Sequence, residues 1–334
     1  MYDKPFHKGA LRGYRFLVTG GAGFIGSHLL EYLLKFNAGK VIVLDNLSTG
    51  NMSNLAPFSK NKSFEFINGD IVNPEVCRDA CIHVDYILHM AALGSVPRSV
   101  ENPLATHHAN TTGFLNMLVA ARDAKVTRMV YAGSSSVYGD NKDIPKKEEN
   151  TGDPLSPYAV TKRTDELYAM VFNSLYNLDL AGLRFFNIFG PRQNPSGPYA
   201  AAIPQFIAAL LQNKAPLIYG SGKQTRDFTF VENAVQACIK ALFVKSRVAR
   251  GNVFNIATGN SVAVIDIFYM IRKILNAGIN PEFAPPRRGE AMRSLASLAR
   301  ARKLLGYVPD TNWQEGLKKT VEWFILQSGK PESL

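Results

Sequence analysis

The stretch SPYAVTK places a tyrosine and a lysine four residues apart, as Tyr158 and Lys162. Because they stand at the start of a helix-like segment, both side chains should lie on one helix face, within reach of a shared ligand. A free tyrosine, with a pKa of about 10, is a poor base at neutral pH, but a nearby ammonium stabilises the phenolate. The pair is therefore a candidate for taking a proton from a hydroxyl group. A lone Tyr-x-x-x-Lys is more often a solvated helix face, so the interpretation depends on its surroundings.

Three consecutive serines, Ser134, Ser135 and Ser136, stand about twenty residues before this pair. The RMVYAG pattern that precedes them is typical of a strand that enters the core. Serine runs usually mark a solvated loop and nothing more. Because the Tyr-Lys pair follows, a serine at this strand end is a candidate for hydrogen-bonding a substrate oxygen during proton transfer. We assign that role to Ser134.

A glycine-rich turn follows the first apolar run, in TGGAGFIGSHLLEYLL, with Gly20, Gly23 and Gly26 at intervals of three residues. Glycine permits a tight turn and a close approach of the backbone to a pyrophosphate, and the helix that follows offers N–H donors. The second strand ends in Asp45, nineteen residues after Gly26. A carboxylate there accepts hydrogen bonds from ribose hydroxyls and repels a 2′-phosphate, which predicts NAD rather than NADP. A glycine turn without a ligand is the alternative interpretation.

Two further strand ends carry residues suited to the same ligand. The third predicted strand ends in NGDIVN and the fourth in LHMAAL. Open parallel sheets bind ligands at the carboxyl ends of their strands. We therefore expect Asp70 to hold the adenine amino group and the backbone of Ala91 and Ala92 to pass close to the cofactor.

Short apolar runs alternate with helix-like segments through the first half of the chain, as in YRFLVTG, KVIVLD, VDYILHM and DLAGLRFF. This order predicts an α/β fold, a Rossmann-type doubly wound parallel sheet with a smaller α/β substrate domain. We expect residues 1–186 to form the NAD-binding domain. Residues 187–230 and 259–334, which are less regular and richer in Pro and Gly, should form the substrate domain, and 231–258 should return to the first domain.

The composition narrows the possible partners. The formal net charge of the 334 residues is +11, but the basic residues are scattered, so we expect a small anionic ligand rather than nucleic acid. The three cysteines have neither metal-site nor disulfide-framework spacing, and we predict no metal. No stretch reaches the roughly 18 apolar residues that span a bilayer, and the opening lacks a signal-peptide run. We therefore expect a cytoplasmic protein without a membrane partner.

The motifs, taken in order, resemble those of the extended short-chain dehydrogenase/reductase superfamily, and within it the nucleotide-sugar 4-epimerases. They cover nearly the whole chain: TGGAGFIG, LDNLSTG, GDI, HMAALGSVPRS, NTTGFLNML, SSSVYG, SPYAVTK, LRFFNIFGPRQ, YGSGKQTRDFTFVEN, FNIATG and LGYVPDTNWQEGLKKTVEWF. The resemblance implies catalysis by Ser134, Tyr158 and Lys162. It implies that NAD is bound by Gly20, Gly23, Phe24, Ile25, Gly26, Asp45, Asn46, Ser48, Thr49, Gly50, Asp70, Ile71, Ala91, Ala92, Asn110, Tyr158, Lys162 and Phe186.

The resemblance also implies a UDP-sugar substrate. Its expected contacts are Gly94, Ser95, Ser134, Ser135, Ser136, Tyr158, Asn187, Ala201, Tyr219, Arg226, Arg287, Glu290 and Ser294. The related 4,6-dehydratases carry Thr-Asp-Glu where this chain has its three serines, and those acids serve water elimination. Their absence favours epimerisation, in which Tyr158 takes the 4-hydroxyl proton while a hydride leaves C4 for NAD. The 4-keto sugar then turns over and the hydride returns to its opposite face.

Within the 4-epimerases, AALGSVPRS and SSSVYG are most similar to the subgroup that acts on UDP-N-acetylglucosamine and UDP-N-acetylgalactosamine, or on their uronic acids. Ser294 aligns with a gate position that is bulky in enzymes restricted to UDP-glucose and UDP-galactose, so it leaves volume for a 2-acetamido group. The chain departs from the pattern at Glu290, where aspartate is usual, and at Ser297, where an acid is usual. Arg98 is either a partner for a C6 carboxylate or a structural arginine.

Other activities remain open: a UDP-glucuronate or UDP-glucose 4-epimerase, a nucleotide-sugar decarboxylase, or a non-catalytic NAD-binding protein. Members of the family usually form homodimers through two helices per subunit, which here correspond to residues 103–124 and 157–176. Apolar residues recur in these segments at helical spacing, which burial within one subunit explains equally well. They are Leu115, Leu118, Val119, Leu167, Met170 and Val171.

Overall fold

A computed structural model describes residues 1–197, 199–286 and 292–329 of the chain. Its centre is a seven-stranded sheet in the order β11-β6-β5-β4-β1-β2-β3, with every neighbouring pair parallel. The strands are β1 (Arg15–Thr19), β2 (Lys40–Asp45), β3 (Phe64–Asn68), β4 (Tyr86–His89), β5 (Arg128–Ser134), β6 (Leu180–Phe185) and β11 (Asn252–Ile256). The predicted doubly wound α/β fold is therefore confirmed. From β1 the strands are added outward in one direction as far as β3, and from β4 they are added in the other direction. Such folds bind ligands at this switch point, between β1 and β4.

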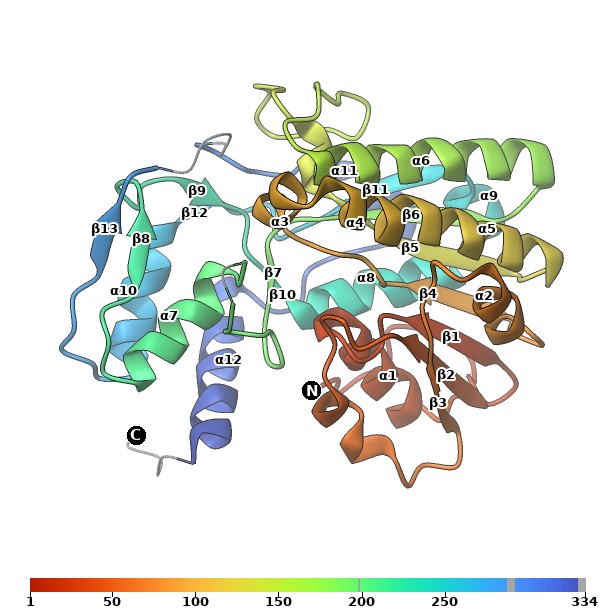
Figure 1. Cartoon of the computed structure of the whole chain (residues 1–334), viewed down its shortest axis with the longest axis horizontal. Helices are drawn as coiled ribbons and strands as arrows, with labels where there is room; N and C mark the ends of the chain where they lie inside the picture. Colours follow the sequence, from red (N-terminus) through yellow and green to blue (C-terminus); the bar gives the residue numbers. More distant parts are fainter. Residues whose placement is uncertain (198, 287–291, 330–334) are drawn as a thin grey trace.

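Helices cover both faces of this sheet, as Figure 1 shows. The apolar core on one face includes α2 (Pro74–Ala80), α5 (Gly113–Asp123) and α6 (Pro157–Tyr176). The core on the other face includes α1 (Phe24–Lys35), α8 (Val231–Phe243) and α11 (Ala299–Leu305). Because both faces are covered, the strands are apolar in continuous runs rather than alternately, and Phe16, Leu17 and Val18 are all fully buried.

The helix predicted for 103–124 has a break. It consists of α4 (Pro103–His107), a π-helical turn η3 (His108–Thr112) and α5, with α3 (Val96–Glu101) before it. π-helical turns inside α-helices occur mainly at functional sites. The helix predicted for 157–176 is α6, which starts where the Ser156 side chain accepts a hydrogen bond from the N–H of Ala159 at 3.1 Å.

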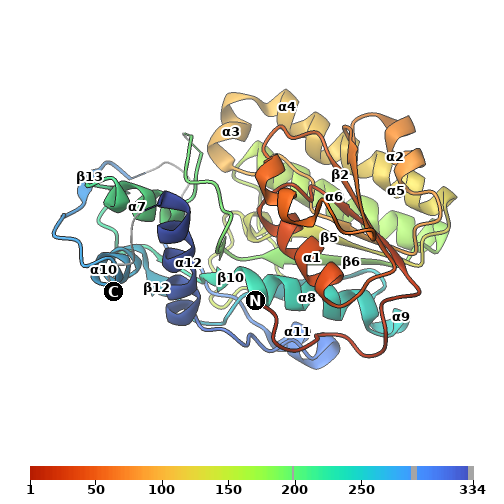
Figure 2. The same cartoon turned by 90° about the horizontal axis from the view of Figure 1, so that it is seen from below.

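The second half of the chain contributes to both parts of the molecule. The segment 231–258, which we expected to return to the first domain, contains α8 and β11, and β11 is an edge strand of the central sheet. A separate core is formed by α7 (Ala202–Leu211), α10 (Val264–Ile274) and α12 (Trp313–Ser328), which lie beside the carboxyl ends of the strands (Figure 2). The division into two domains at the residues given above stays a prediction.

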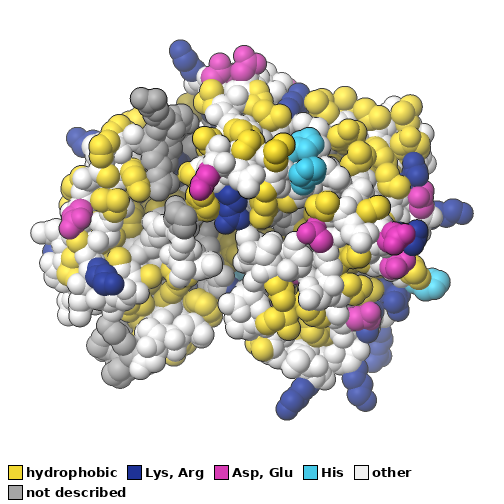
Figure 3. Space-filling view, viewed as in Figure 1, with side chains coloured by type: hydrophobic (Ala, Val, Ile, Leu, Met, Phe, Trp, Pro, Cys, Tyr) yellow, Lys and Arg dark blue, Asp and Glu magenta, His cyan; other side chains and the backbone are white. Residues whose placement is uncertain are grey.

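Within residues 1–197, 199–286 and 292–329, three two-stranded sheets complete this part: β7 (Ile188–Phe189) with β10 (Thr229–Phe230), β9 (Thr225–Arg226) with β12 (Val262–Ala263), and β8 (Leu217–Tyr219) with β13 (Glu282–Ala284). The remaining short helices are η1 (Met52–Asn54), η2 (Ala56–Phe58), η4 (Ser135–Tyr138) and α9 (Ser246–Ala249). The surface is hollowed between the two parts of the molecule, and Lys or Arg side chains lie at the wall of that hollow (Figure 3). Within the described residues, no helix is both long and apolar enough to cross a membrane.

Candidate active site

The glycine turn after β1 has a conformation that side chains would disrupt. Gly20 has a φ of +68°, and a Cβ built there would lie 2.7 Å from the backbone nitrogen of Ala91. A Cβ on Gly26 would collide with the carbonyl oxygen of Gly20. Two of the three glycines are therefore required by the packing of the turn against β4 and against its own helix. The turn leaves a backbone surface that a ligand can approach closely.

Helix α1 begins at this turn with its first N–H groups available. Its N-cap residue, Gly23, makes no side-chain capping hydrogen bond, and no acidic residue stands in the first turn. An uncapped helix N-terminus with its partial positive charge favours an anionic group such as a phosphate. The start of α1 is therefore suited to a pyrophosphate.

Asp45, at the end of β2, holds two loops in place. Its Oδ2 accepts a hydrogen bond from the N–H of Ala22 at 3.0 Å, and its Oδ1 accepts one from the N–H of Leu47 at 2.8 Å. Each carboxylate oxygen has two lone pairs, so capacity remains for a ribose hydroxyl. Next to it, the Asn46 side chain donates to Asp70 Oδ2 at 2.8 Å, which joins the ends of β2 and β3.

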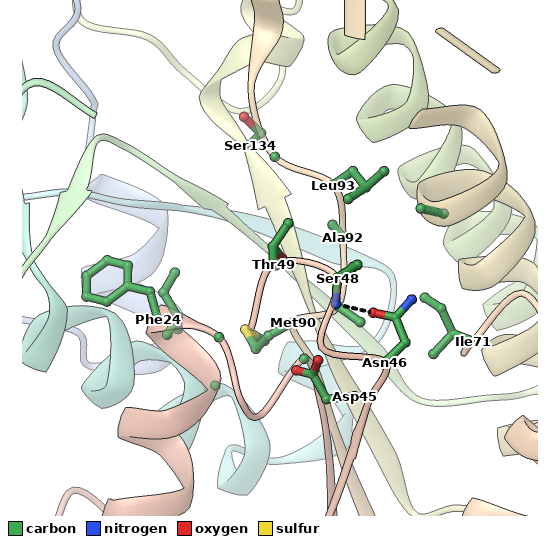
Figure 4. Close-up of a pocket in the computed structure, with 18 of the residues that line it drawn as sticks. Phe24, Asp45, Asn46, Ser48, Thr49, Ile71, Met90, Ala92, Leu93 and Ser134 are labelled. Carbon is green, nitrogen blue, oxygen red and sulfur yellow. Dashed lines mark hydrogen bonds between the residues drawn. The ribbon is translucent and has the colours of Figure 1, made fainter. Parts of the chain in front are cut away.

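A cavity of about 370 Å³ extends from these loops across the carboxyl ends of the strands. Figure 4 shows Asp45 and Ser134 toward opposite ends of it, with Phe24 of α1 at its side. Its wall is formed by Gly20, Gly23, Phe24, Ile25, Gly26, Leu44, Asp45, Asn46, Ser48, Thr49, Gly69, Asp70, Ile71, Met90, Ala91, Ala92, Leu93, Gly94, Ala109, Ala132, Gly133, Ser134, Tyr158, Lys162, Phe185, Asn187 and Ile188. Fifteen of the eighteen residues predicted to bind the cofactor are among them.

The other three predicted cofactor residues, Gly50, Asn110 and Phe186, are not among the residues that line the cavity. A Cβ on Gly50 would meet the Ala22 side chain, so this glycine packs against the turn. Phe186 is fully buried in the core, whereas Phe185, the residue before it, reaches the cavity. The predicted contact of Phe186 with the cofactor stays a prediction, and the residue of this strand end that lines the cavity is Phe185.

Asn110 lies in the π-helical turn, and it supports the cavity from outside. Its Oδ1 accepts from the N–H of Leu93 at 2.7 Å, and its Nδ2 donates to the Leu93 carbonyl at 3.2 Å and to Thr161 Oγ1 at 3.1 Å. Thr161 in turn donates to the carbonyl of Tyr158 at 2.8 Å. Asn110 thus joins the loop after β4 to the first turn of α6, and its place in the structure is that of a positioning residue.

The three predicted catalytic residues line one end of the cavity together. Ser134 is the last residue of β5, and its Oγ accepts from the N–H of Ser136 at 3.1 Å to cap the short helix η4. Tyr158 lies in the first turn of α6, and Lys162 one turn later. Lys162 is 3% exposed, and its ammonium donates to the carbonyl of Ala132 at 3.0 Å.

The ionisable groups around Lys162 are themselves buried. His89, at the end of β4, shares a hydrogen bond with Thr19 Oγ1 at 2.9 Å, and burial together with the charge of Lys162 lowers its pKa to about 3. Burial raises the pKa of Asp165 to about 6, although the Lys162 ammonium opposes the shift. Lys162 is therefore the cation beside Tyr158, and His89 is neutral there at physiological pH.

Sequence comparison matches residues 16–257 to the model of the NAD dependent epimerase/dehydratase family. The chain belongs to this family. It is 38% identical over 316 residues to the UDP-glucose 4-epimerase of Mycolicibacterium smegmatis, with 94% of this chain and 99% of that relative covered. The family depends on NAD, and the uncapped helix, the glycine turn and the Asp45 carboxylate fit that cofactor.

Solved structures agree with this assignment. A UDP-N-acetylglucosamine 4-epimerase from Methanobrevibacter ruminantium, in complex with UDP-N-acetylmuramic acid, is similar with a TM-score of 0.87 at 37% identity, covering 94% of this chain and 99% of that one. A UDP-glucuronic acid 4-epimerase from Bacillus cereus, in complex with UDP-glucuronic acid and NAD, has a TM-score of 0.86 at 30% identity, with the same coverage. These members differ in the sugar they act on, so membership does not fix the substrate.

The predicted substrate residues divide into two groups in this epimerase/dehydratase chain. Gly94, Ser134, Tyr158 and Asn187 line the cavity. The others among the described residues lie outside its wall: Ser95, Ser135, Ser136, Ala201, Tyr219, Arg226 and Ser294. Arg287 and Glu290 lie outside the described residues.

Ser294 and Arg226 are neighbours through a short bridge. Thr225 accepts a backbone hydrogen bond from Ser294 at 3.1 Å, and its carbonyl also accepts from the Arg226 guanidinium at 3.0 Å. The next residue, Asp227, is fully buried and accepts hydrogen bonds from Thr258 and Ala296, which fixes this crossing. The structure therefore places Ser294, the predicted gate residue, beside Arg226, another predicted substrate contact.

A second cavity of about 710 Å³ adjoins the first and shares Gly23, Phe24, Thr49 and Gly94 with it. Two arginines, Arg98 of α3 and Arg192, line it, together with α7 and α12 residues. Sequence reasoning did not include Arg192. Its signal was weak, because only the turn after β7 brings it there, where it forms an ion pair with Glu31 of α1.

Proposed function

We propose that the chain is an NAD-dependent 4-epimerase that interconverts UDP-N-acetylglucosamine and UDP-N-acetylgalactosamine, or the corresponding uronic acids, through a transient 4-keto sugar. The observation that carries the proposal is that Ser134, Tyr158 and Lys162 line the same cavity as the glycine turn. A base for a sugar hydroxyl and a dinucleotide site are therefore parts of one continuous space.

Each of these side chains has a defined task. Tyr158 takes the proton of the 4-hydroxyl group and later returns it, because a phenolate can act as a general base when a cation stabilises it. Lys162 supplies that cation, and the Ala132 carbonyl holds it in place. The Ser134 hydroxyl donates a hydrogen bond to the sugar oxygen as charge develops on it. When bound, NAD supplies the acceptor and the donor of the hydride at C4.

The charges on the cavity wall support epimerisation over dehydration. Among the described residues that line it, the carboxylates are Asp45, which ends β2, and Asp70, which follows β3, and both lie at the cofactor end. At the positions of Ser135 and Ser136, the related 4,6-dehydratases carry an aspartate and a glutamate. Elimination of water requires an acid and a base at C5 and C6 in addition to the tyrosine. The described wall offers none at the reacting end.

Open space beside the reacting end supports an N-acetylated sugar. A Cβ built on Gly94 would meet no heavy atom within 4 Å among the described residues. The polar side chain of Ser294 at the gate adds little bulk. The Methanobrevibacter ruminantium relative, a UDP-N-acetylglucosamine 4-epimerase, is similar over nearly the whole chain.

A second candidate is a UDP-glucuronate 4-epimerase. Arg98 lines the cavity that adjoins Gly94, and its guanidinium lies 5.1 Å from the centre of the Tyr199 ring. A guanidinium in this position can bind a sugar carboxylate in a bidentate manner. The choice between the two candidates depends on whether C6 of the preferred sugar is oxidised.

One experiment tests both candidates. Purified protein with its bound NAD is incubated with UDP-N-acetylglucosamine, its uronic acid, UDP-glucuronate or UDP-glucose, and the anomeric protons are followed by NMR. We expect UDP-N-acetylglucosamine to yield UDP-N-acetylgalactosamine without added NAD. Mass detection separates decarboxylation, which loses carbon dioxide, from epimerisation, which conserves mass. If NAD is bound and all four sugars stay unchanged, the proposal is wrong.

We also propose that the protein is a homodimer. Leu167, Met170 and Val171 of α6 are 45%, 56% and 42% exposed, and Val119 of α5 is 36% exposed, whereas Leu118 is fully buried. Apolar residues on adjacent helices thus form an uncovered face. Met170→Glu should give a monomer by light scattering, whereas Leu326→Glu, at an exposed position on α12, should leave the mass unchanged. A wild-type monomer would exclude the dimer.

A further inference from the structure

Asp165 lies directly behind the catalytic pair. Tyr158, Lys162 and Asp165 follow one another on α6 at spacings of four and three residues, so all three lie on one face of the helix. Asp165 is 1% exposed, and its Oδ2 accepts a hydrogen bond from the Lys162 ammonium at 3.2 Å. Its Oδ1 has no partner among the described residues. A buried carboxylate with one free oxygen is costly, so its presence needs an explanation.

The contact fixes the direction of the Lys162 ammonium. An ammonium has three donors. One is taken by the Ala132 carbonyl and one by Asp165, which leaves a single donor for the cavity that Lys162 lines. Without Asp165, the ammonium could rotate about its last bond and distribute its donors differently.

The neighbouring charged groups are paired among themselves. Glu166 binds the Arg184 guanidinium through both oxygens, at 2.7 and 2.9 Å, and also pairs with Arg163. Burial keeps His89 neutral, and it raises the pKa of Tyr131 on β5 well above its usual value. Asp165 is therefore the carboxylate whose charge acts on Lys162 without a compensating arginine.

The helices α3, α4, η3 and α5, which pack against α6, place no buried charged side chain against Asp165. On α4 and η3, His107 and His108 are exposed, and on α3 Glu101 is exposed while Arg98 is half-buried and turned to Tyr199. Arg122 and Asp123, at the far end of α5, pair with each other at 2.7 Å. The electrostatic partner of Asp165 is thus Lys162, with a smaller repulsion from Glu166.

We infer that Asp165 is a positioning residue for catalysis: it directs one Lys162 donor into the cavity, and its negative charge offsets part of the positive potential at Tyr158. The inference rests on the proposed function only in taking Tyr158 as the base. Burial raises the pKa of Asp165 to about 6, so this offset is present above that pH and is lost as the carboxyl group takes up a proton below it.

The test measures the Tyr158 phenolate directly in the NAD-bound protein. The near-ultraviolet absorbance is titrated with pH, and the titration of the matching Tyr158→Phe protein is subtracted to remove the other tyrosines. In Asp165→Asn, which removes a negative charge, the Tyr158 midpoint should move to lower pH by about 0.5 units or more. With any sugar that the wild type turns over, the acid limb of kcat/KM should move in the same direction.

Asp179→Asn is the matched control. Asp179 is also a buried carboxylate, paired with Arg128 at 2.8 Å, but it precedes β6 at the opposite end of the strands. The Asp179→Asn variant should leave the midpoint of the Tyr158 titration unchanged. If Asp165→Asn does not fold, Asp165→Ser replaces it, since it is smaller and keeps an oxygen.

A midpoint that stays in place or rises in a folded Asp165 variant overturns the inference, as does an equal shift in Asp179→Asn. Because the titration needs no substrate, it stays interpretable even if the wild type turns over none of the sugars. Failure of the proposed function and failure of this inference are therefore distinct results.

Discussion

The Lys162 ammonium donates to the backbone carbonyl oxygen of Ala132 at 3.0 Å, and this bond joins helix α6 to the end of strand β5. Ala132 stands two residues before Ser134, and Lys162 one helical turn after Tyr158. The lysine therefore does more than supply charge, because it ties the segment that carries the serine to the segment that carries the tyrosine.

Replacing Tyr158 by phenylalanine removes the proposed base and leaves the ring in place. We expect kcat to fall by about 10²- to 10⁴-fold, the usual contribution of a positioned general base. The bound NAD should remain, since the glycine turn and Asp45 are untouched. Steady-state turnover and the NAD content of the purified protein check this. Tyr176→Phe, on the exposed far end of the same helix, is the control, and undiminished turnover in Tyr158→Phe would support a non-catalytic role.

Ser134→Ala should have two separable effects. The loss of a hydrogen bond to a developing charge should lower kcat by about tenfold to a hundredfold. The loss of the cap on η4, where Ser134 Oγ accepts from Ser136, should cost about 1 kcal/mol in the free energy of unfolding. Urea unfolding and turnover measure the two effects. Asn73→Ala removes the cap of α2 far from the cavity, and it should reproduce the stability loss but not the kinetic one.

Asp45→Asn should weaken NAD binding by about tenfold to a hundredfold, because one amide group cannot accept from both the Ala22 and the Leu47 N–H groups. Removing the negative charge should also narrow the preference for NAD over NADP. Calorimetric titration of the cofactor-free protein with both dinucleotides gives both values. Asp85→Asn serves as the control, since Asp85 accepts from Arg15 at the opposite end of β1. Equal NAD affinity in Asp45→Asn would remove Asp45 from the cofactor site.

Two buried histidines predict how stability depends on pH. Burial lowers the pKa of both His28 and His89 to about 3, below the usual value of 6.5. Between these pH values the unfolded chain binds the protons and the folded chain does not, so the free energy of unfolding falls as the pH falls below about 6.5. Denaturant unfolding between pH 7 and pH 5 should show this decline.

His28→Gln keeps a donor for the Pro191 carbonyl, which His28 Nε2 contacts at 3.0 Å, and removes one of the two titrating groups. The free energy of unfolding should then fall less steeply as the pH falls, because about one proton fewer is taken up on unfolding. His107→Gln, at an exposed position, should not change the slope. A slope in His28→Gln equal to that of the wild type would mean that His28 is not the group that resists protonation.

Several features followed from the sequence because they depend on local chemistry. Three such features are the glycine turn at Gly20, the carboxylate at the end of the second strand, and the Tyr-Lys pair at helical spacing. Each specifies a short piece of backbone whatever the rest of the fold does. The alternation of apolar runs and helices then fixed a parallel sheet, and a parallel sheet brings its strand ends to one edge. The residues that line the cofactor end of the cavity were predictable for this reason.

Other features were decided only by the tertiary structure. Phe185 rather than Phe186 reaches the cavity, and Asn110 supports it from behind, because both depend on which side of a strand or a π-helical turn faces a neighbour from a distant part of the chain. Helical spacing brings Asp165 next to Lys162, but the burial of Asp165, and the pairing of its neighbour Glu166 with Arg184 of β6, depend on the packing of α6 against the sheet. Spacing along a helix gives the direction of a side chain, but the groups that meet it, and the water excluded around it, are set by packing between segments far apart in sequence.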